Sequence, residues 1–113
     1  MDWIYLKGIP IEAQYLYRKA LEYSKFERYE TALRYFRQTV VIAPRYSKAF
    51  CEMGNCLENL GQYDEAIALY DRALDIDPLI ADARKKKDRI IRNRELNTNG
   101  HTFMEKSSVK SLQ

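Results

Sequence analysis

The side chains best suited to chemistry in this sequence are two cysteines and a single histidine. Cys51 and Cys56 lie five residues apart, so on a helix their side chains point about 140° away from each other and cannot form a disulfide. His101 lies near the C-terminus, with no cluster of metal-ligand residues around it. We therefore predict reduced structural thiols and neither a metal site nor a cofactor.

The acidic residues do not form a catalytic arrangement either. No histidine lies near a cysteine or serine, and no glycine-rich loop could hold a phosphate group. Acidic residues at the starts of predicted helices are explained by the helix dipole; they include Glu30, Asp64 and Glu65. We predict that this protein is not an enzyme.

A run of basic residues occupies positions 84–94. It holds seven basic residues and one acidic residue, a net charge of +6, whereas the whole chain carries +3, so the remainder carries −3. The run admits three interpretations: a solvated helix face, a surface for an acidic protein, or a site for nucleic acid. Nucleic acid is the least favoured of these, because no aromatic residues alternate with the basic ones to stack on bases.

Length and composition indicate one helical domain. The chain has 113 residues, with 46% hydrophobic and 31% charged residues, and only four glycines and three prolines. A sheet protein of this size usually needs more turn residues. No apolar run is long enough to span a membrane, and the first residues do not resemble a secretory signal, so we expect a cytoplasmic protein.

The three prolines, Pro10, Pro44 and Pro78, are each separated by 34 residues. Other residues agree at the same offset, which is typical of a repeat architecture; these pairs are Tyr29 with Tyr63, Ala32 with Ala66, Phe36 with Tyr70, and Ile42 with Ile76. Apolar residues at spacings of three and four predict helices over 11–25, 29–42, 47–60, 63–76 and 80–96.

The repeated pattern has a specific form. Residues 47–80 contain the spacing Phe50-x2-Met53-Gly54-x2-Leu57, then Ala66-x3-Tyr70, then Pro78. Residues 13–46 repeat it more loosely, and Glu27 stands where the second unit has the turn glycine, Gly61. This pattern resembles the tetratricopeptide repeat family.

The resemblance implies an all-α, right-handed superhelical array of two helix-turn-helix repeats and a C-terminal capping helix. We assign repeat 1 to residues 13–46, repeat 2 to 47–80 and the capping helix to 81–96. Residues 97–113 lose the periodicity and are predicted to be disordered.

The N-terminal segment, residues 1–12, is apolar and includes Trp3, Ile4 and Leu6. Its proline, Pro10, lies 34 residues before Pro44, as Pro44 lies before Pro78, so the segment is interpreted as the last turns of a truncated upstream repeat. It would either fold over the first helix pair or dock on another copy, so a homodimer or larger homo-oligomer through residues 1–9 is an alternative.

Stacked helix pairs curve, and the first helix of each pair lines the concave side. The contact residues expected there are Tyr17, Leu21, Lys48, Asn55, Lys85, Arg89 and Arg92. We predict that this groove binds a protein or peptide with an apolar anchor and an acidic end. The alternatives are a self-assembling building block and nucleic-acid binding through the basic capping helix.

Overall fold

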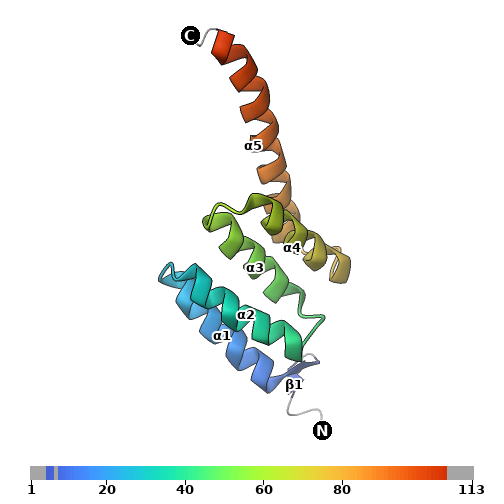
Figure 1. Cartoon of the computed structure of the whole chain (residues 1–113). Coiled ribbons are helices and arrows are strands. Elements are labelled where there is room, and N and C mark those ends of the chain that lie inside the picture. Colours follow the sequence, from blue (N-terminus) through green and yellow to red (C-terminus); the bar gives the residue numbers. More distant parts are fainter. Residues whose placement is uncertain (1–4, 7, 107–113) are drawn as a thin grey trace.

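The computed structural model describes residues 5–6 and 8–106, and the side chains of residues 8–96. Five helices follow one another as a stack of antiparallel hairpins (Figure 1). They are α1 (Ile11–Lys25), α2 (Tyr29–Ile42), α3 (Ser47–Asn59), α4 (Tyr63–Ile76) and α5 (Ala81–Lys106). The predicted all-α fold of two helix-turn-helix repeats and a capping helix is confirmed.

The two hairpin turns have the same backbone geometry, although their sequences differ. Gly61 has a φ of 82° and Glu27, its counterpart 34 residues earlier, has a φ of 63°. In the first turn the Arg28 N–H donates to the Tyr23 carbonyl over 2.9 Å, and the matching bond in the second turn ends on Leu57. These hydrogen bonds cap the last carbonyls of the first helix in each hairpin, and they require one turn residue in the left-handed region of φ. That conformation is strained for Glu27, which has a Cβ atom.

Within each hairpin, a small residue faces a large aromatic one where the two helices cross. A Cβ atom on Gly54 would lie 2.6 Å from Cε1 of Tyr70, so any side chain there would displace the ring. Ala20 and Phe36 occupy the corresponding positions of the first hairpin, and both are fully buried. This close approach explains why the sequence places small residues at these crossings.

The two hairpins pack on each other mainly through α2 and α3. The Cys56 thiol of α3 lies 3.9 Å from the Ser24 hydroxyl of α1, which brings these two helices to the same side of the stack. Cys51 and Cys56 are free and buried, as expected for structural thiols.

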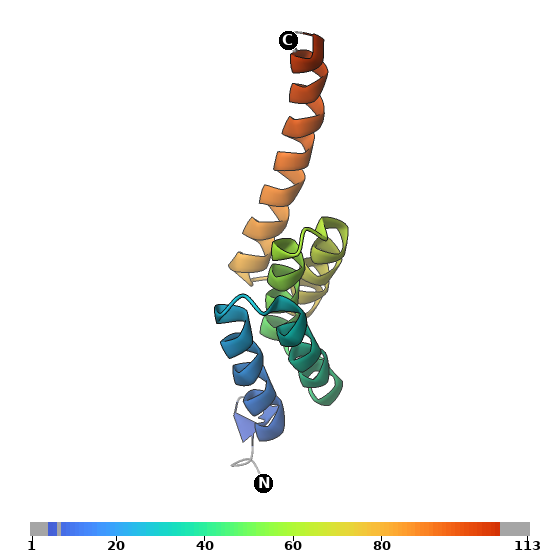
Figure 2. The same cartoon turned by 60° about the vertical axis from the view of Figure 1, so that its left-hand side comes forward.

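Helix α5 caps the second hairpin and projects beyond it (Figure 2). Its residues Ala83 and Ile90 are buried in the core. The helix continues to Lys106, so the predicted end at residue 96 and the prediction of disorder for 97–106 are wrong. The loss of apolar periodicity ends packing against the body, but it does not end the helix, because no proline follows Pro78. The rest of the predicted tail, residues 107–113, lies outside the described residues.

In its described residues before α1, which are 5–6 and 8–10, the N-terminal segment forms a β-hairpin and not the last turns of a helix. Two short strands, β1 (Tyr5–Leu6) and β2 (Ile9–Pro10), pair in antiparallel fashion with Leu6 opposite Ile9. Gly8, between the strands, has a φ of 80°, a conformation that glycine adopts readily in tight turns. The predicted homo-oligomer contact involves residues 1–4 and 7, which lie outside the described residues.

Candidate protein-binding face

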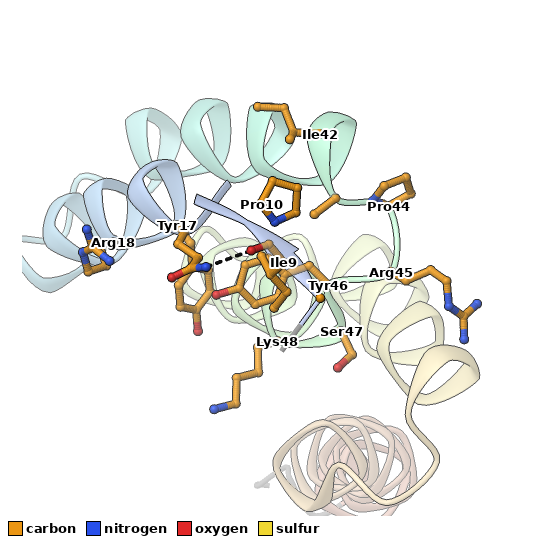
Figure 3. A pocket seen from close by; sticks show the side chains of 13 residues that line it. Ile9, Pro10, Tyr17, Arg18, Ile42, Pro44, Arg45, Tyr46, Ser47 and Lys48 are labelled. Atoms are coloured by element: carbon orange, nitrogen blue, oxygen red, sulfur yellow. Dashed lines mark hydrogen bonds between the residues drawn. The ribbon is translucent and has the colours of Figure 1, made fainter. Parts of the chain in front are cut away.

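A hollow lies between the N-terminal hairpin and the start of α3. It has a volume of about 880 Å³ and is bounded by the β2 strand, α1 and the connection from α2 to α3 (Figure 3). We call it the hairpin pocket, and its lining residues are Gly8, Ile9, Pro10, Gln14, Tyr17, Arg18, Ile42, Ala43, Pro44, Arg45, Tyr46, Ser47 and Lys48.

Aromatic rings form the centre of the hairpin pocket. The ring of Tyr17 lies 4.7 Å from that of Tyr46 and 5.8 Å from that of Phe36, measured between centroids. The Gln14 side-chain amide donates a 2.8 Å hydrogen bond to the carbonyl of Ile9, which fastens the hairpin to α1. Burial raises the pKa of both tyrosines, so their hydroxyls stay protonated and can donate hydrogen bonds.

Three cationic side chains surround this apolar centre. Arg18, Arg45 and Lys48 are exposed and lie on different sides of the pocket (Figure 3). No aspartate or glutamate is among the described lining residues, and within residues 8–96 none of the three cations forms an ion pair. The hairpin pocket therefore combines an apolar floor with a net positive rim.

Next to the hairpin pocket, α3 and α5 form a surface that carries both positive and negative charges. Lys86 donates a 3.3 Å hydrogen bond to the side-chain oxygen of Asn55. Glu52 is half-buried, and burial raises its pKa; the nearby charges of Lys86 and Lys48 lower this pKa, and that of Asp82 raises it. We call the surface formed by Tyr17, Lys48, Glu52, Asn55 and Lys86 the groove face.

At the α5 end, cations are engaged within the chain. Arg89 binds the carboxylate of Glu58, and Tyr70 donates a 2.8 Å hydrogen bond to the other oxygen of that carboxylate. Two further pairs attach α5 to α4: Lys87 with Asp71, and Arg94 with Asp64. Exposed ion pairs contribute little free energy individually, but together these contacts fix the position of α5 on the second hairpin.

The structure brings together some of the predicted contact residues and separates others. Tyr17 and Lys48 line the hairpin pocket, and Asn55 lies beside Lys86 further along the groove face. Leu21 lies partly buried against the core and lines a different hollow, of about 510 Å³. Arg89, predicted as a contact residue of the groove, forms an ion pair with Glu58.

Lys85 and Arg92 are exposed on α5. Each is two residues from a buried one, Ala83 and Ile90 respectively, and two residues correspond to about 200° around a helix. Both side chains therefore leave α5 on the side opposite its buried stripe.

Several residues of the pocket were not predicted from the sequence. Arg45 and Tyr46 belong to the connection between the repeats, Ile9 belongs to the hairpin, and Arg18 lies one residue beyond Tyr17 on α1. The predicted contact residues all came from the inner faces of the first helices and the capping helix. The alternation of aromatic and basic residues in Arg45-Tyr46-Ser47-Lys48 is the signal that could have identified this surface.

Other functional chemistry finds no support in the described part of the chain. Its His, Cys, Asp and Glu residues form no group of three or more that could hold a metal ion. Burial raises the pKa of both thiols to about 11, which keeps them protonated at neutral pH. Among the described helices, none combines the length and apolarity needed to cross a bilayer.

Comparison with known proteins gives the family directly. Two family models described as tetratricopeptide repeat match residues 13–46 and 47–78, which together cover more than half of the chain.

Two relatives are also similar in sequence. The small glutamine-rich tetratricopeptide repeat-containing protein 2 of Mycosarcoma maydis is 28% identical over 69 residues, which are 61% of this chain and 20% of that protein. An uncharacterized protein of Methanocaldococcus jannaschii is 29% identical over 77 residues, 68% of this chain and 90% of that protein. The chain thus spans about a fifth of the length of the first relative and most of the second. With two matching repeats and the fold described above, the chain belongs to the tetratricopeptide repeat family.

Proposed function

We propose that this protein is an interaction module whose groove face binds a segment of a partner protein. Tetratricopeptide repeats generally mediate protein–protein interactions, which makes binding rather than catalysis the expected role of this chain. The observation that carries the proposal is the hairpin pocket, a hollow of about 880 Å³ at one end of the groove face. It is large enough to accept one or more large side chains of a partner.

The chemistry of the pocket indicates what the bound segment contains. Tyr17, Tyr46 and Ile9 offer apolar surface for an apolar anchor side chain. The rim carries Arg18, Arg45 and Lys48 and favours a partner with acidic groups, because complementary charge increases both the rate and the specificity of association. Asn55 and Lys86, further along, can bind the backbone of an extended segment with their amide and ammonium groups.

Charge reversal on the groove face tests this proposal. The Lys48→Glu variant changes an exposed residue of the pocket rim, and Arg34→Glu makes the same charge change on the exposed side of α2. Tagged wild-type and variant chains are used to capture proteins from the native cell extract, and the captured proteins are quantified by mass spectrometry.

We expect the proteins enriched by the wild-type chain to be retained by Arg34→Glu and lost with Lys48→Glu. Both variants should keep the helical circular dichroism of the wild type, because both residues are exposed. Equal retention of every partner by the two variants would show that binding does not use this face.

A further inference from the structure

The proposed function places acidic groups of the partner at the pocket rim but does not say how they are arranged around the apolar anchor, and the inference here rests on that function. We infer that the hairpin pocket recognises a large apolar side chain flanked on both sides by aspartate or glutamate. The acidic part of the partner then binds beside Tyr17 and Tyr46, not along the basic run of α5 as the sequence suggested.

Four of the seven basic residues in the α5 run already contact other groups of this chain, whereas Arg84, Lys85 and Arg92 are exposed. Arg89, Lys87 and Arg94 each contact a carboxylate of the second hairpin, and Lys86 binds Asn55. A partner's carboxylate would have to compete with these internal contacts. The exposed Lys85 and Arg92 lie about 200° around α5 from Ala83 and Ile90, on the side away from the buried stripe.

The pocket combines a positive rim with apolar surface, and of its three cations only Lys48 acts on a nearby carboxylate among the described residues, the half-buried Glu52 of the groove face. Arg18, Arg45 and Lys48 have no ion-pair partner within residues 8–96, and the described lining contains no carboxylate. Low-dielectric walls such as the Tyr17 and Tyr46 rings strengthen the field of nearby charges. An acidic group entering this pocket would therefore gain attraction without displacing an existing ion pair.

The three cations of the rim are spread around the pocket (Figure 3). Arg18, Arg45 and Lys48 come from α1, the α2–α3 connection and α3, and they lie around the aromatic centre, not in one cluster (Figure 3). A single carboxylate could contact only one or two of them. A segment with an acidic residue before and after its apolar anchor would place a carboxylate on two sides of the pocket while the anchor covers the rings.

Synthetic peptides provide the test with the full-length chain. The probe is the acetylated and amidated peptide Gly-Ser-Glu-Phe-Glu-Ser-Gly, and its affinity is measured from amide chemical-shift changes of the isotope-labelled protein. Three comparison peptides replace both glutamates by glutamine, replace phenylalanine by alanine, or move the acidic residues to a free C-terminal carboxylate after phenylalanine. The first probe should bind most tightly, and the glutamine peptide should bind roughly tenfold more weakly.

Protein variants locate the site. Arg45→Glu should weaken the glutamate probe roughly fivefold and leave the glutamine peptide unaffected, whereas Lys85→Glu and Arg92→Glu should change neither. The shift changes should centre on Tyr17, Tyr46 and Lys48.

Three outcomes would overturn the inference: loss of binding in the α5 variants but not in Arg45→Glu, tighter binding of the peptide with the free terminus, or no binding of the glutamate probe at millimolar concentration. In the first two cases the groove face would still bind a protein segment, so the proposed function would survive. Loss of captured partners with Lys48→Glu tests that function separately.

Discussion

Replacing Glu27 by glycine should stabilise the protein, because the turn after α1 holds a non-glycine residue in the left-handed region. Glu27 has a φ of 63°, and its counterpart in the second repeat is Gly61 with a φ of 82°. A side chain in this conformation costs about 1–2 kcal/mol. Glycine removes this strain, but it lowers the free energy of unfolding by about 0.5–1 kcal/mol because it gives the unfolded chain greater conformational freedom.

The difference between these two ranges is about 0–1.5 kcal/mol, and we expect a net gain near its middle, about 0.5–1 kcal/mol in the free energy of unfolding. For a domain of about 100 residues this corresponds to an increase in Tm of roughly 2–6 °C. Urea and thermal unfolding followed by circular dichroism at 222 nm measure both quantities.

Two control variants separate backbone strain from other effects of the change. Glu27→Ala removes the same carboxylate but keeps a Cβ atom, so it should not gain the stability seen with glycine. Gly61→Ala creates the strain in the second turn and should destabilise the protein by about 1 kcal/mol or more. If Glu27→Gly lowers the Tm, or if Glu27→Ala raises it as much, the turn is not strained as described.

Three further predictions concern the core. Gly54→Ala should lower the free energy of unfolding by about 1–3 kcal/mol in urea, despite the better helix propensity of alanine, because its Cβ would meet the Tyr70 ring; an unchanged midpoint would contradict the close crossing. Tyr70→Phe should cost about 1 kcal/mol by removing the hydrogen bond to Glu58, and a neutral result would mean that this bond adds no net stability. Burial raises the pKa of Cys51 and Cys56 from 9.0 to about 11. Between about pH 9 and 11 only the unfolded thiols ionise, so the free energy of unfolding should fall over this range, whereas below pH 8 it should not depend on these thiols. Replacing both cysteines by serine should flatten this dependence on pH.

The repeat architecture was accessible from sequence because it depends on local and periodic signals. The 34-residue spacing of the prolines and the Gly54 and Tyr70 pair fix where helices end and where they cross. Helices α1, α2 and α4 begin and end where the apolar periodicity predicted. The end of α5 was wrong because periodicity reports packing, and a helix can continue without it.

The candidate site was less accessible because it depends on contacts between distant segments. The residues around Arg89 in the sequence do not indicate that it forms an ion pair with Glu58, 31 residues earlier. The hairpin pocket requires β2 and the α2–α3 connection to meet α1, whereas the proline in phase with the repeats predicted a helical remnant at residues 1–10. Side-chain direction on one helix could therefore predict Tyr17 and Lys48 but not the cations that complete the rim.

Site-specific photo-crosslinking in the native cell tests the central proposal most directly. A photoreactive phenylalanine derivative is placed at position 48 on the pocket rim and, as the matched control, at position 34 on the exposed side of α2. We expect covalent adducts to a partner protein from position 48 and none from position 34. Adducts that form from position 34 alone would contradict the proposal.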